Sequence, residues 1–296
     1  MKKLIVIAGP TASGKTDLAI QLAQHFHTEI ISADSRQCYK ELGIGVAKPS
    51  EAQLQLVKHH FINSHSIYED VSAGEYERFG LAVLDEIFAK NDVAILVGGT
   101  GLYIKAICEG IDEMPPIDDS IKKDVEAQFH ENGLSWLQNK VKETDPDFYA
   151  VGEIDNPMRL MRALTFKLST QKSIVNYRNS TIKQRNFQIE KYAIDIEKAS
   201  LYEKINERVD CMIAQGLVAE AETFIPIKHF KNLQTVGYTE LFSYFDGDCD
   251  LNFAIDKIKQ HTRNYAKRQI TWFKNQGQYV ICPADVISKK LMNSKD

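Results

Sequence analysis

Apolar residues follow two alternating patterns along the first hundred positions of the chain. Runs of consecutive apolar residues rich in Ile and Val, typical of parallel strands buried on both faces, occur at 3–8, 29–33 and 93–97. Amphipathic helical periodicity separates these runs, at 15–26 and 73–90. Strands that alternate with helices in this way predict an α/β fold built on a doubly wound parallel sheet.

The pattern changes after Pro115-Pro116, which we interpret as a domain boundary. From 118 to about 185 the periodicity is helical and contains no strand-like run, so we expect a helical domain over 115–186. The catalytic core is then expected to comprise 1–114 and 187–296. Its later elements are predicted as strands at 187–196 and 279–281 and helices at 199–215, 217–224, 237–245 and 251–274.

A glycine-rich turn joins the first predicted strand to the first predicted helix. It consists of Gly9, Pro10, Thr11, Ala12, Ser13, Gly14, Lys15 and Thr16. The glycines allow backbone N–H groups to surround an anion, the helix N-terminus adds its dipole, and Lys15 adds a full charge. The Thr16 hydroxyl is a candidate ligand for Mg²⁺. The fold class expected is therefore α/β, a P-loop NTPase-like doubly wound parallel sheet with a helical insertion domain, and a diphosphate or triphosphate compound should bind to residues 9–16.

Two polar residues follow strands of the predicted sheet. Asp34 comes directly after the run 29–33, and Thr100 follows two glycines after the run 93–97. Ligands of such sheets bind at the carboxyl ends of the strands, so both residues are expected near the glycine-rich turn. Asp34 is suited to orient a metal or to act as general base, with a turn cap as the structural alternative. Thr100 is a candidate hydroxyl donor or, equally, a helix N-cap.

Positive charge is concentrated in two segments, although the 296-residue chain has a net charge of -4. Segment 157–191 contains eight basic residues and one acid, and segment 257–274 contains six basic residues and no acid. In the second segment, Arg263 and Lys267 fall near one face of a predicted helix. Two such segments in an acidic protein favour binding of a polyanion such as nucleic acid over two solvated surface patches.

Cysteine spacing and hydropathy argue against a zinc site and a membrane anchor. The five cysteines are scattered and odd in number, so we expect free thiols. His59 and His60 lack a third metal ligand nearby and are expected to be structural. No apolar run is long enough to span a membrane, and Met1 leads directly into a strand, so a cytoplasmic protein is expected. We also expect a monomer.

Several segments together resemble the signature blocks of one enzyme family, the bacterial tRNA dimethylallyltransferases. The similar segments run in order along most of the chain, at 9–16, 32–39, 43–49, 59–60, 96–103, 156–164, 236–238 and 265–272. Val46, Asn63, Met158 and Thr165 depart from residues that are common in that family. The joint agreement is more specific than the glycine-rich turn alone.

The resemblance implies transfer of a dimethylallyl group from its diphosphate to N6 of adenosine at tRNA position 37, next to the anticodon. Asp34 would accept the N6 proton, Thr100 would lie beside the reacting centre, and Arg208 would bind the diphosphate with residues 9–16 and Mg²⁺. Contacts with tRNA are implied or expected for Asp34, Ser35, Arg36, Gln37, Met158, Arg159, Leu160, Met161, Arg162, Thr235, Val236, Gly237, Tyr238, Thr239, Glu240, Arg263 and Lys267.

Three other functions remain open from the sequence. A P-loop small-molecule kinase would use Asp34 to activate a hydroxyl, but it leaves the two basic segments without a role. An RNA-binding NTPase switch would need a second acid at a strand end, where Gly98 and Gly99 stand instead. An enzyme that prenylates free adenine nucleotides would not need the helical insertion.

Overall fold

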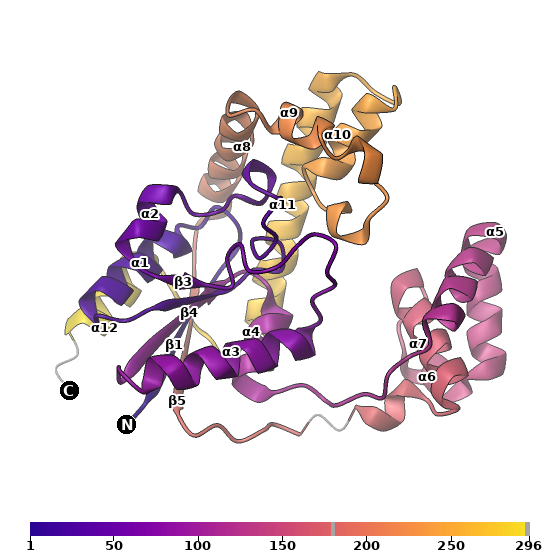
Figure 1. Cartoon of the computed structure of the whole chain (residues 1–296), viewed down its shortest axis with the longest axis horizontal. Coiled ribbons are helices and arrows are strands. Elements are labelled where there is room, and N and C mark those ends of the chain that lie inside the picture. Colours follow the sequence, from indigo (N-terminus) through magenta and orange to yellow (C-terminus); the bar gives the residue numbers. More distant parts are fainter. Residues whose placement is uncertain (179–180, 294–296) are drawn as a thin grey trace. The chain divides into compact units, whose positions relative to one another are not determined.

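A six-stranded, fully parallel sheet forms the centre of the computed structural model, which describes residues 1–178 and 181–293 (Figure 1). Strands β2, β3 and β4 lie on one side of β1, and β5 and β6 lie on its other side, which makes the sheet doubly wound. The strands lie in the order β3 (His59–His60), β2 (Ile30–Ala33), β4 (Val93–Gly98), β1 (Lys3–Ala8), β5 (Gln188–Ile194) and β6 (Val280–Cys282).

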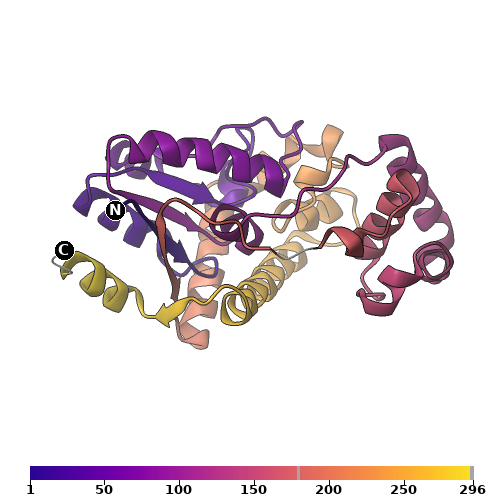
Figure 2. The same cartoon turned by 90° about the horizontal axis from the view of Figure 1, so that it is seen from below.

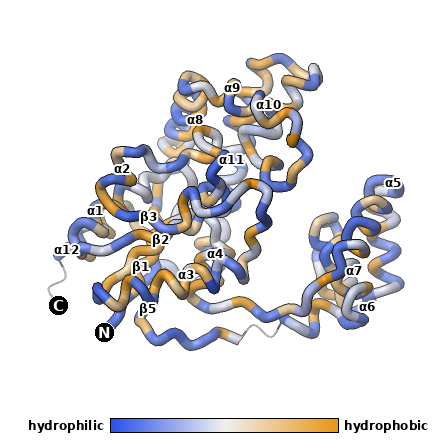
Figure 3. The backbone as a smooth tube through the Cα atoms, viewed as in Figure 1, coloured by the Kyte–Doolittle hydropathy of each residue, from blue (hydrophilic) through white to orange (hydrophobic). Residues whose placement is uncertain are grey.

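Both faces of the sheet are covered because successive residues of β1 point in opposite directions. Leu4 and Val6 belong to the apolar cluster that includes α3 (Ala73–Phe88) and α4 (Gly101–Glu109). Ile5 and Ile7 pack instead with α1 (Lys15–His25) and α12 (Ala284–Asn293). Figure 2 shows α3, in purple, and α12, in yellow, on opposite sides of the strands, and Figure 3 shows the hydrophobic character of β1. The predicted fold class is confirmed.

The remaining helices of this part of the chain follow the predicted order closely. Their bounds are α2 (Glu51–Leu56), α8 (Lys198–Ala214), α9 (Leu217–Glu222), α10 (Tyr238–Phe245) and α11 (Leu251–Asn275), with short 3-10 turns at Ile44–Val46, Ile225–Ile227 and Lys231–Leu233. Three elements were not predicted: α2, β3 and α12. Helix α2 has fewer than two turns, and strand β3 has two residues. Both are too short to produce a hydrophobic period in the sequence.

Contacts divide the chain into two compact units, one of residues 1–110 and 184–296 and one of residues 111–183. The second unit contains α5 (Asp119–Thr144), α6 (Pro146–Val151), α7 (Pro157–Thr170) and a 3-10 turn at Ile174–Tyr177. Its own core is built around buried residues that include Leu137, Phe148 and Leu160. Residues 179–180 of the predicted insertion and 294–296 of the predicted core lie outside the described residues.

The first basic segment does not form one surface. Arg185 belongs to the first unit, where its buried guanidinium pairs with Glu77 at 2.8 Å and donates to the Ala106 carbonyl. Lys191, on β5 of the sheet, pairs with Glu109 at 3.0 Å. The interpretation of 157–191 as one polyanion-binding segment was therefore wrong, because part of its charge is neutralised inside the core.

The cysteines and the lengths of the helices were also predicted from the sequence. All five cysteines are free thiols, as predicted. Across residues 1–178 and 181–293, no helix is both long enough and apolar enough to cross a bilayer.

Candidate active site

The glycine loop, residues 9–16, connects β1 to α1 at the carboxyl end of the sheet. Gly14 has a φ of 82°, a left-handed conformation that an L side chain rarely adopts, and it immediately precedes the first residue of α1. At Gly9, an added Cβ would lie 2.9 Å from the Ser13 hydroxyl oxygen. Both glycines are thus required for the loop to curl over the N-terminus of α1, where backbone N–H groups and the helix dipole favour an anion.

Lys15 supplies a cation inside this loop. Its ammonium donates to the Pro10 carbonyl at 3.1 Å, which folds the side chain back over the loop. The pKa of Lys15 is lowered to about 8, chiefly by burial; the Asp34 carboxylate opposes this shift and the Arg208 cation adds to it. Two cations held close together and away from water are stabilised by a multiply charged anion between them.

Ser13 and Thr11 complete the anchoring of the glycine loop. The Ser13 hydroxyl oxygen is buried and has no hydrogen-bond partner among the residues that the structure describes. Buried polar atoms are almost always paired, so this hydroxyl is well suited to bind a ligand oxygen. The Thr11 N–H donates to the Gln269 side-chain oxygen at 2.9 Å, and the Gln269 amide donates to the Gly99 carbonyl at 3.0 Å.

Asp34 lies directly after β2, as predicted from the sequence. One carboxylate oxygen, Oδ1, accepts the N–H groups of Arg36 at 2.9 Å and Gln37 at 3.3 Å. This turn cap is the structural alternative that the sequence left open, and it coexists with a functional role because Asp34 also lines the main pocket. The cap fixes one oxygen and so sets the direction of the other.

Thr100 is held next to the Asp34 turn but does not line the pocket. Its hydroxyl oxygen accepts the Ser35 N–H at 3.1 Å, and its own N–H donates to the Ala33 carbonyl at 3.0 Å. Thr100 occupies the N-cap position of α4, although its side chain does not cap that helix. The observed contacts therefore make Thr100 a support for the segment that carries Asp34.

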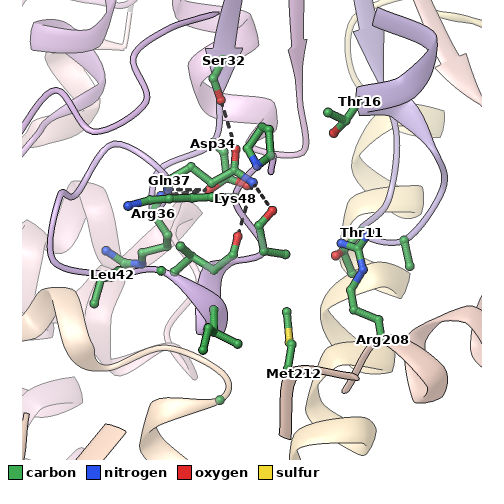
Figure 4. Close-up of a pocket in the computed structure, with 18 of the residues that line it drawn as sticks. Thr11, Thr16, Ser32, Asp34, Arg36, Gln37, Leu42, Lys48, Arg208 and Met212 are labelled. Carbon is green, nitrogen blue, oxygen red and sulfur yellow. Dashed lines mark hydrogen bonds between the residues drawn. The ribbon is translucent and has the colours of Figure 1, made fainter. Parts of the chain in front are cut away.

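The main pocket has a volume of about 950 Å³ and lies entirely within the first unit. It brings together residues 11–16 of the glycine loop, the Asp34–Gln37 segment, Arg208 on α8 and residues 235–237 before α10. Figure 4 shows Arg208 beside Thr11 on one side of the pocket and Asp34 with Arg36 and Gln37 on the other. Burial lowers the pKa of Arg208, and Asp17 opposes that shift.

Five predicted tRNA-binding residues of the core do not line the main pocket: Tyr238, Thr239, Glu240, Arg263 and Lys267. Tyr238 is fully buried and Glu240 is 7% exposed, so side-chain contacts of these two residues with tRNA are not consistent with the structure. Glu240 instead accepts the Gly237 N–H at 2.7 Å. Arg263 and Lys267 lie on α11, each with its charge within 6 Å of the Tyr202 ring centre. Thr239, at the start of α10, is exposed.

The predicted tRNA-binding residues of the second unit divide by helical face. Met158 is 64% exposed and Arg159 and Arg162 are exposed, so all three side chains are accessible to a ligand. Leu160 is fully buried in the core of this unit, and Met161 packs against the same core. A direct side-chain contact of Leu160 with tRNA was therefore a wrong expectation, because consecutive helical positions point to different faces.

Several pocket residues were missed by sequence reasoning. The largest group forms the pocket loop, residues 43–49, which was noticed only as part of a family resemblance. Glu220 and Gln269 anchor the two loops through hydrogen bonds that join residues at least 175 positions apart. No local pattern marks such residues, because a single Glu or Gln on a helix is most often solvated.

The pocket offers few metal ligands of its own. Among residues 1–178 and 181–293, no group of three His, Cys, Asp or Glu side chains could hold a metal ion. Thr16, Asp17 and Asp34 do line the pocket. One hydroxyl and a carboxylate are a typical protein contribution for Mg²⁺, which usually takes its remaining ligands from water and substrate phosphates. His59 and His60 bind the Val57 carbonyl and Glu29, respectively.

A model of the IPP transferase family matches residues 37–276. The chain belongs to the IPP transferase family. Among curated relatives, it is 47% identical to the tRNA dimethylallyltransferase of Flavobacterium johnsoniae over 280 residues, which cover 93% of this chain and 91% of the relative. It is 44% identical to the tRNA dimethylallyltransferase of Christiangramia forsetii over 290 residues, covering 98% and 96%.

A solved structure of the IPP transferase family supports the same assignment. The tRNA isopentenylpyrophosphate transferase of Bacillus halodurans superposes with a TM-score of 0.73 at 31% identity, covering 99% of this chain and 95% of that one. The predicted family resemblance is confirmed, and it extends over both units of the chain.

Proposed function

We propose that this protein transfers a dimethylallyl group from dimethylallyl diphosphate to N6 of adenosine 37 of tRNA, releasing diphosphate. The observation that carries the proposal is the pocket that sets an anion-binding loop and Arg208 opposite the Asp34 carboxylate. One wall suits a diphosphate leaving group and the other suits a general base. The relatives of the chain are named for dimethylallyl or isopentenyl transfer to tRNA.

The chemistry divides between these two walls. As the allylic carbon–oxygen bond breaks, negative charge develops on the departing diphosphate, where Lys15, Arg208 and the loop N–H groups stabilise it. N6 of the adenine attacks the allylic carbon and forms the new carbon–nitrogen bond. Asp34 accepts the proton that N6 loses, so the charge of the product amine stays neutral.

Mg²⁺ fits this site as a partner of the diphosphate. Thr16 would hold it from the protein side, and the ion would neutralise part of the charge that builds on the leaving group. The unpaired Ser13 hydroxyl and Lys15 would contact the same phosphate oxygens.

The acceptor must enter the pocket as an exposed base. The N6 group of an adenine is hidden by stacking and pairing, so enzymes that modify bases take them out of the stack. Residues 35–37 and 235–237 line the pocket and are the proposed contacts for the splayed nucleotide. Arg159, Arg162 and the cations of α11 are the proposed contacts with the RNA backbone.

We propose that the enzyme acts as a monomer, and its tRNA substrate suggests the cytoplasm. Of the alternatives, prenylation of free adenine nucleotides leaves the exposed arginines of α7 without a role. A small-molecule kinase leaves the tRNA-modifying relatives unexplained.

The test is transfer of labelled dimethylallyl from its diphosphate to unmodified tRNA in the presence of Mg²⁺. Asp34→Asn keeps the oxygen that accepts the Arg36 and Gln37 N–H groups but removes the base, so we expect kcat to fall about 10²–10⁴-fold. Asp195→Asn is the matched control, since Asp195 follows β5 at the same edge of the sheet and does not line the main pocket.

Other outcomes would redirect the proposal. Label in AMP but not in tRNA would favour the free-nucleotide enzyme. Magnesium-dependent ATP turnover without any transfer of the prenyl group would favour the kinase.

A further inference from the structure

The pocket loop, residues 43–49, is held in place from two sides by residues outside it. We propose that Glu220 on α9 is a positioning residue that sets the orientation of Asp34 through this loop. The two carboxyl groups do not touch. Two sets of hydrogen bonds, linked in series by the backbone of the pocket loop, join them, and each bond is present in the structure.

The first part of the series joins α9 to the pocket loop. Glu220 accepts the Ile44 N–H at 2.8 Å through Oε2 and the Gly45 N–H at 2.9 Å through Oε1. The Tyr238 hydroxyl donates to Oε1 at 2.6 Å. One carboxylate thus receives three donors, two of them from consecutive backbone amides, which is a strong and directional arrangement.

The second part joins the pocket loop to the Asp34 turn. The Gln37 side-chain amide donates to the carbonyls of Val46 at 3.3 Å and Ala47 at 3.0 Å. The Gln37 backbone N–H donates to Asp34 Oδ1 at 3.3 Å. Displacement of the loop would therefore remove the acceptors of Gln37 and loosen the cap that orients the Asp34 carboxylate.

Packing makes the loop a rigid spacer between these two ends. An added Cβ at Gly45 would lie 2.6 Å from the ring of Tyr238, so the loop backbone rests directly on that buried side chain. Ala47 has a φ of 50°, a left-handed conformation that persists only where surrounding contacts impose it. Burial and the neighbouring Glu220 carboxylate raise the pKa of Tyr238, which keeps the hydroxyl protonated as a donor.

The same series connects three segments of the pocket. Glu220 lies on the helix that follows α8, which carries Arg208, and Tyr238 begins α10 directly after pocket residues 235–237. Glu220 is thus placed to hold residues 235–237, which are proposed to contact the acceptor nucleotide, in a fixed position relative to Asp34. The glycine loop has no member in this series, so diphosphate binding should be independent of Glu220.

Amide hydrogen exchange tests the series without reference to catalysis. In Glu220→Gln, the new amide can accept only one of the two N–H groups and opposes the other. We expect exchange in peptides covering 43–47 and in those covering 35–38 to rise by about tenfold or more, since the protecting hydrogen bonds are lost. Glu222→Gln, an exposed position on the same helix, is the matched control.

The exchange pattern also separates positioning from general destabilisation. Tyr238→Phe leaves both Glu220 bonds to the loop N–H groups intact and should exchange nearly as the natural protein does. Faster exchange at 43–47 without any change at 35–38 would overturn the proposal, as would unchanged exchange at both segments. Faster exchange spread over β1 and α3 as well would show that Glu220 is merely structural.

Steady-state kinetics provide a second test, which rests on the proposed function. We expect Glu220→Gln to lower kcat/KM for tRNA about tenfold while KM for dimethylallyl diphosphate changes less than about twofold, because only the Asp34 side is disturbed. Equal losses for both substrates would contradict a positioning role. If the natural protein transfers no prenyl group, the proposed function fails, whereas the exchange result still decides the role of Glu220.

Discussion

Two loops line the same pocket, and they are held in opposite ways. The glycine loop, residues 9–16, is shaped by its own residues: Gly14 provides the left-handed turn and Lys15 binds back to the Pro10 carbonyl. Apart from Gln269, which accepts the Thr11 N–H, its shape depends on local sequence. The pocket loop, residues 43–49, takes its position from Gln37, Glu220 and Tyr238 outside it.

The difference agrees with the ligand that each loop is proposed to bind. A diphosphate is a compact anion that backbone N–H groups and one lysine can recognise on any sheet of this type. An adenosine in tRNA must instead be placed relative to one carboxylate, so its side of the pocket needs contacts from several distant elements. Substitutions in the glycine loop should therefore affect the diphosphate, and substitutions around the pocket loop should affect the acceptor.

The largest expected effect comes from removing the cation of the glycine loop. Lys15→Ala should lower kcat/KM for prenyl transfer about 10²–10³-fold, since Lys15 is proposed to contact the leaving group where its charge develops. The melting temperature should not fall, because a half-buried cation with a lowered pKa contributes little to stability. Steady-state kinetics with both substrates and thermal unfolding measure this, with exposed Lys204→Ala on α8 as control. A loss confined to KM for tRNA would contradict the comparison.

A smaller effect is expected from a single methyl group in the pocket loop. Gly45→Ala would press a Cβ against the Tyr238 ring, and overpacking of this kind costs about 1–3 kcal/mol, enough to shift the loop. We expect kcat/KM for tRNA to fall about tenfold with little change in KM for dimethylallyl diphosphate.

Ala47→Gly is the matched control in the same loop. Ala47 already has a positive φ, which glycine adopts without strain, so this variant should keep nearly full activity. If the two variants behave alike, the contact with Tyr238 does not hold the loop.

Close to neutral pH, the smallest effect expected is a pH dependence of diphosphate binding. The pKa of Lys15 is about 8 in the free protein, below its usual value, so the side chain loses its charge as the pH rises through 8. Binding of an anion requires the charged form, and affinity should therefore be full below pH 8 and fall by at most about tenfold per pH unit above it.

Calorimetric titration with inorganic diphosphate from pH 6.5 to 9.5 measures this dependence. The difference between the natural protein and Lys15→Met isolates the lysine from ionisation of the ligand itself. A difference that is constant across this range would contradict the lowered pKa.

Sequence reasoning predicted the parts of the molecule that have a local pattern. The runs 3–8 and 93–97 became β1 and β4, and the predicted helix 73–90 became α3, because burial on one stripe or on both faces leaves a period in the chain. Asp34 was found because the ends of parallel strands meet at one edge of the sheet. The resemblance of scattered blocks supplied Arg208, which no local pattern marks.

Residues within a recognised block were harder to assign individually. Leu160 and Tyr238 belong to segments that resemble tRNA-binding blocks, yet both side chains are fully buried. Resemblance to a family's signature block indicates that a segment is functional. It does not distinguish the residues that contact a ligand from those that support the backbone. Arg185 illustrates the same difficulty for charge, since its pair with Glu77 joins positions more than a hundred residues apart.

The sequence by itself therefore predicted most strands of the sheet, its winding, the glycine loop and the strand-end position of Asp34, because each leaves a pattern in residues that are close along the chain. Only the tertiary structure decided which side chains face the pocket and what holds them. The hydrogen bonds of Glu220 to Ile44 and of Gln269 to Thr11 form only when the sheet and the C-terminal helices have packed together. Such long-range contacts leave no period or spacing in the sequence, and the position of the pocket loop depends on them.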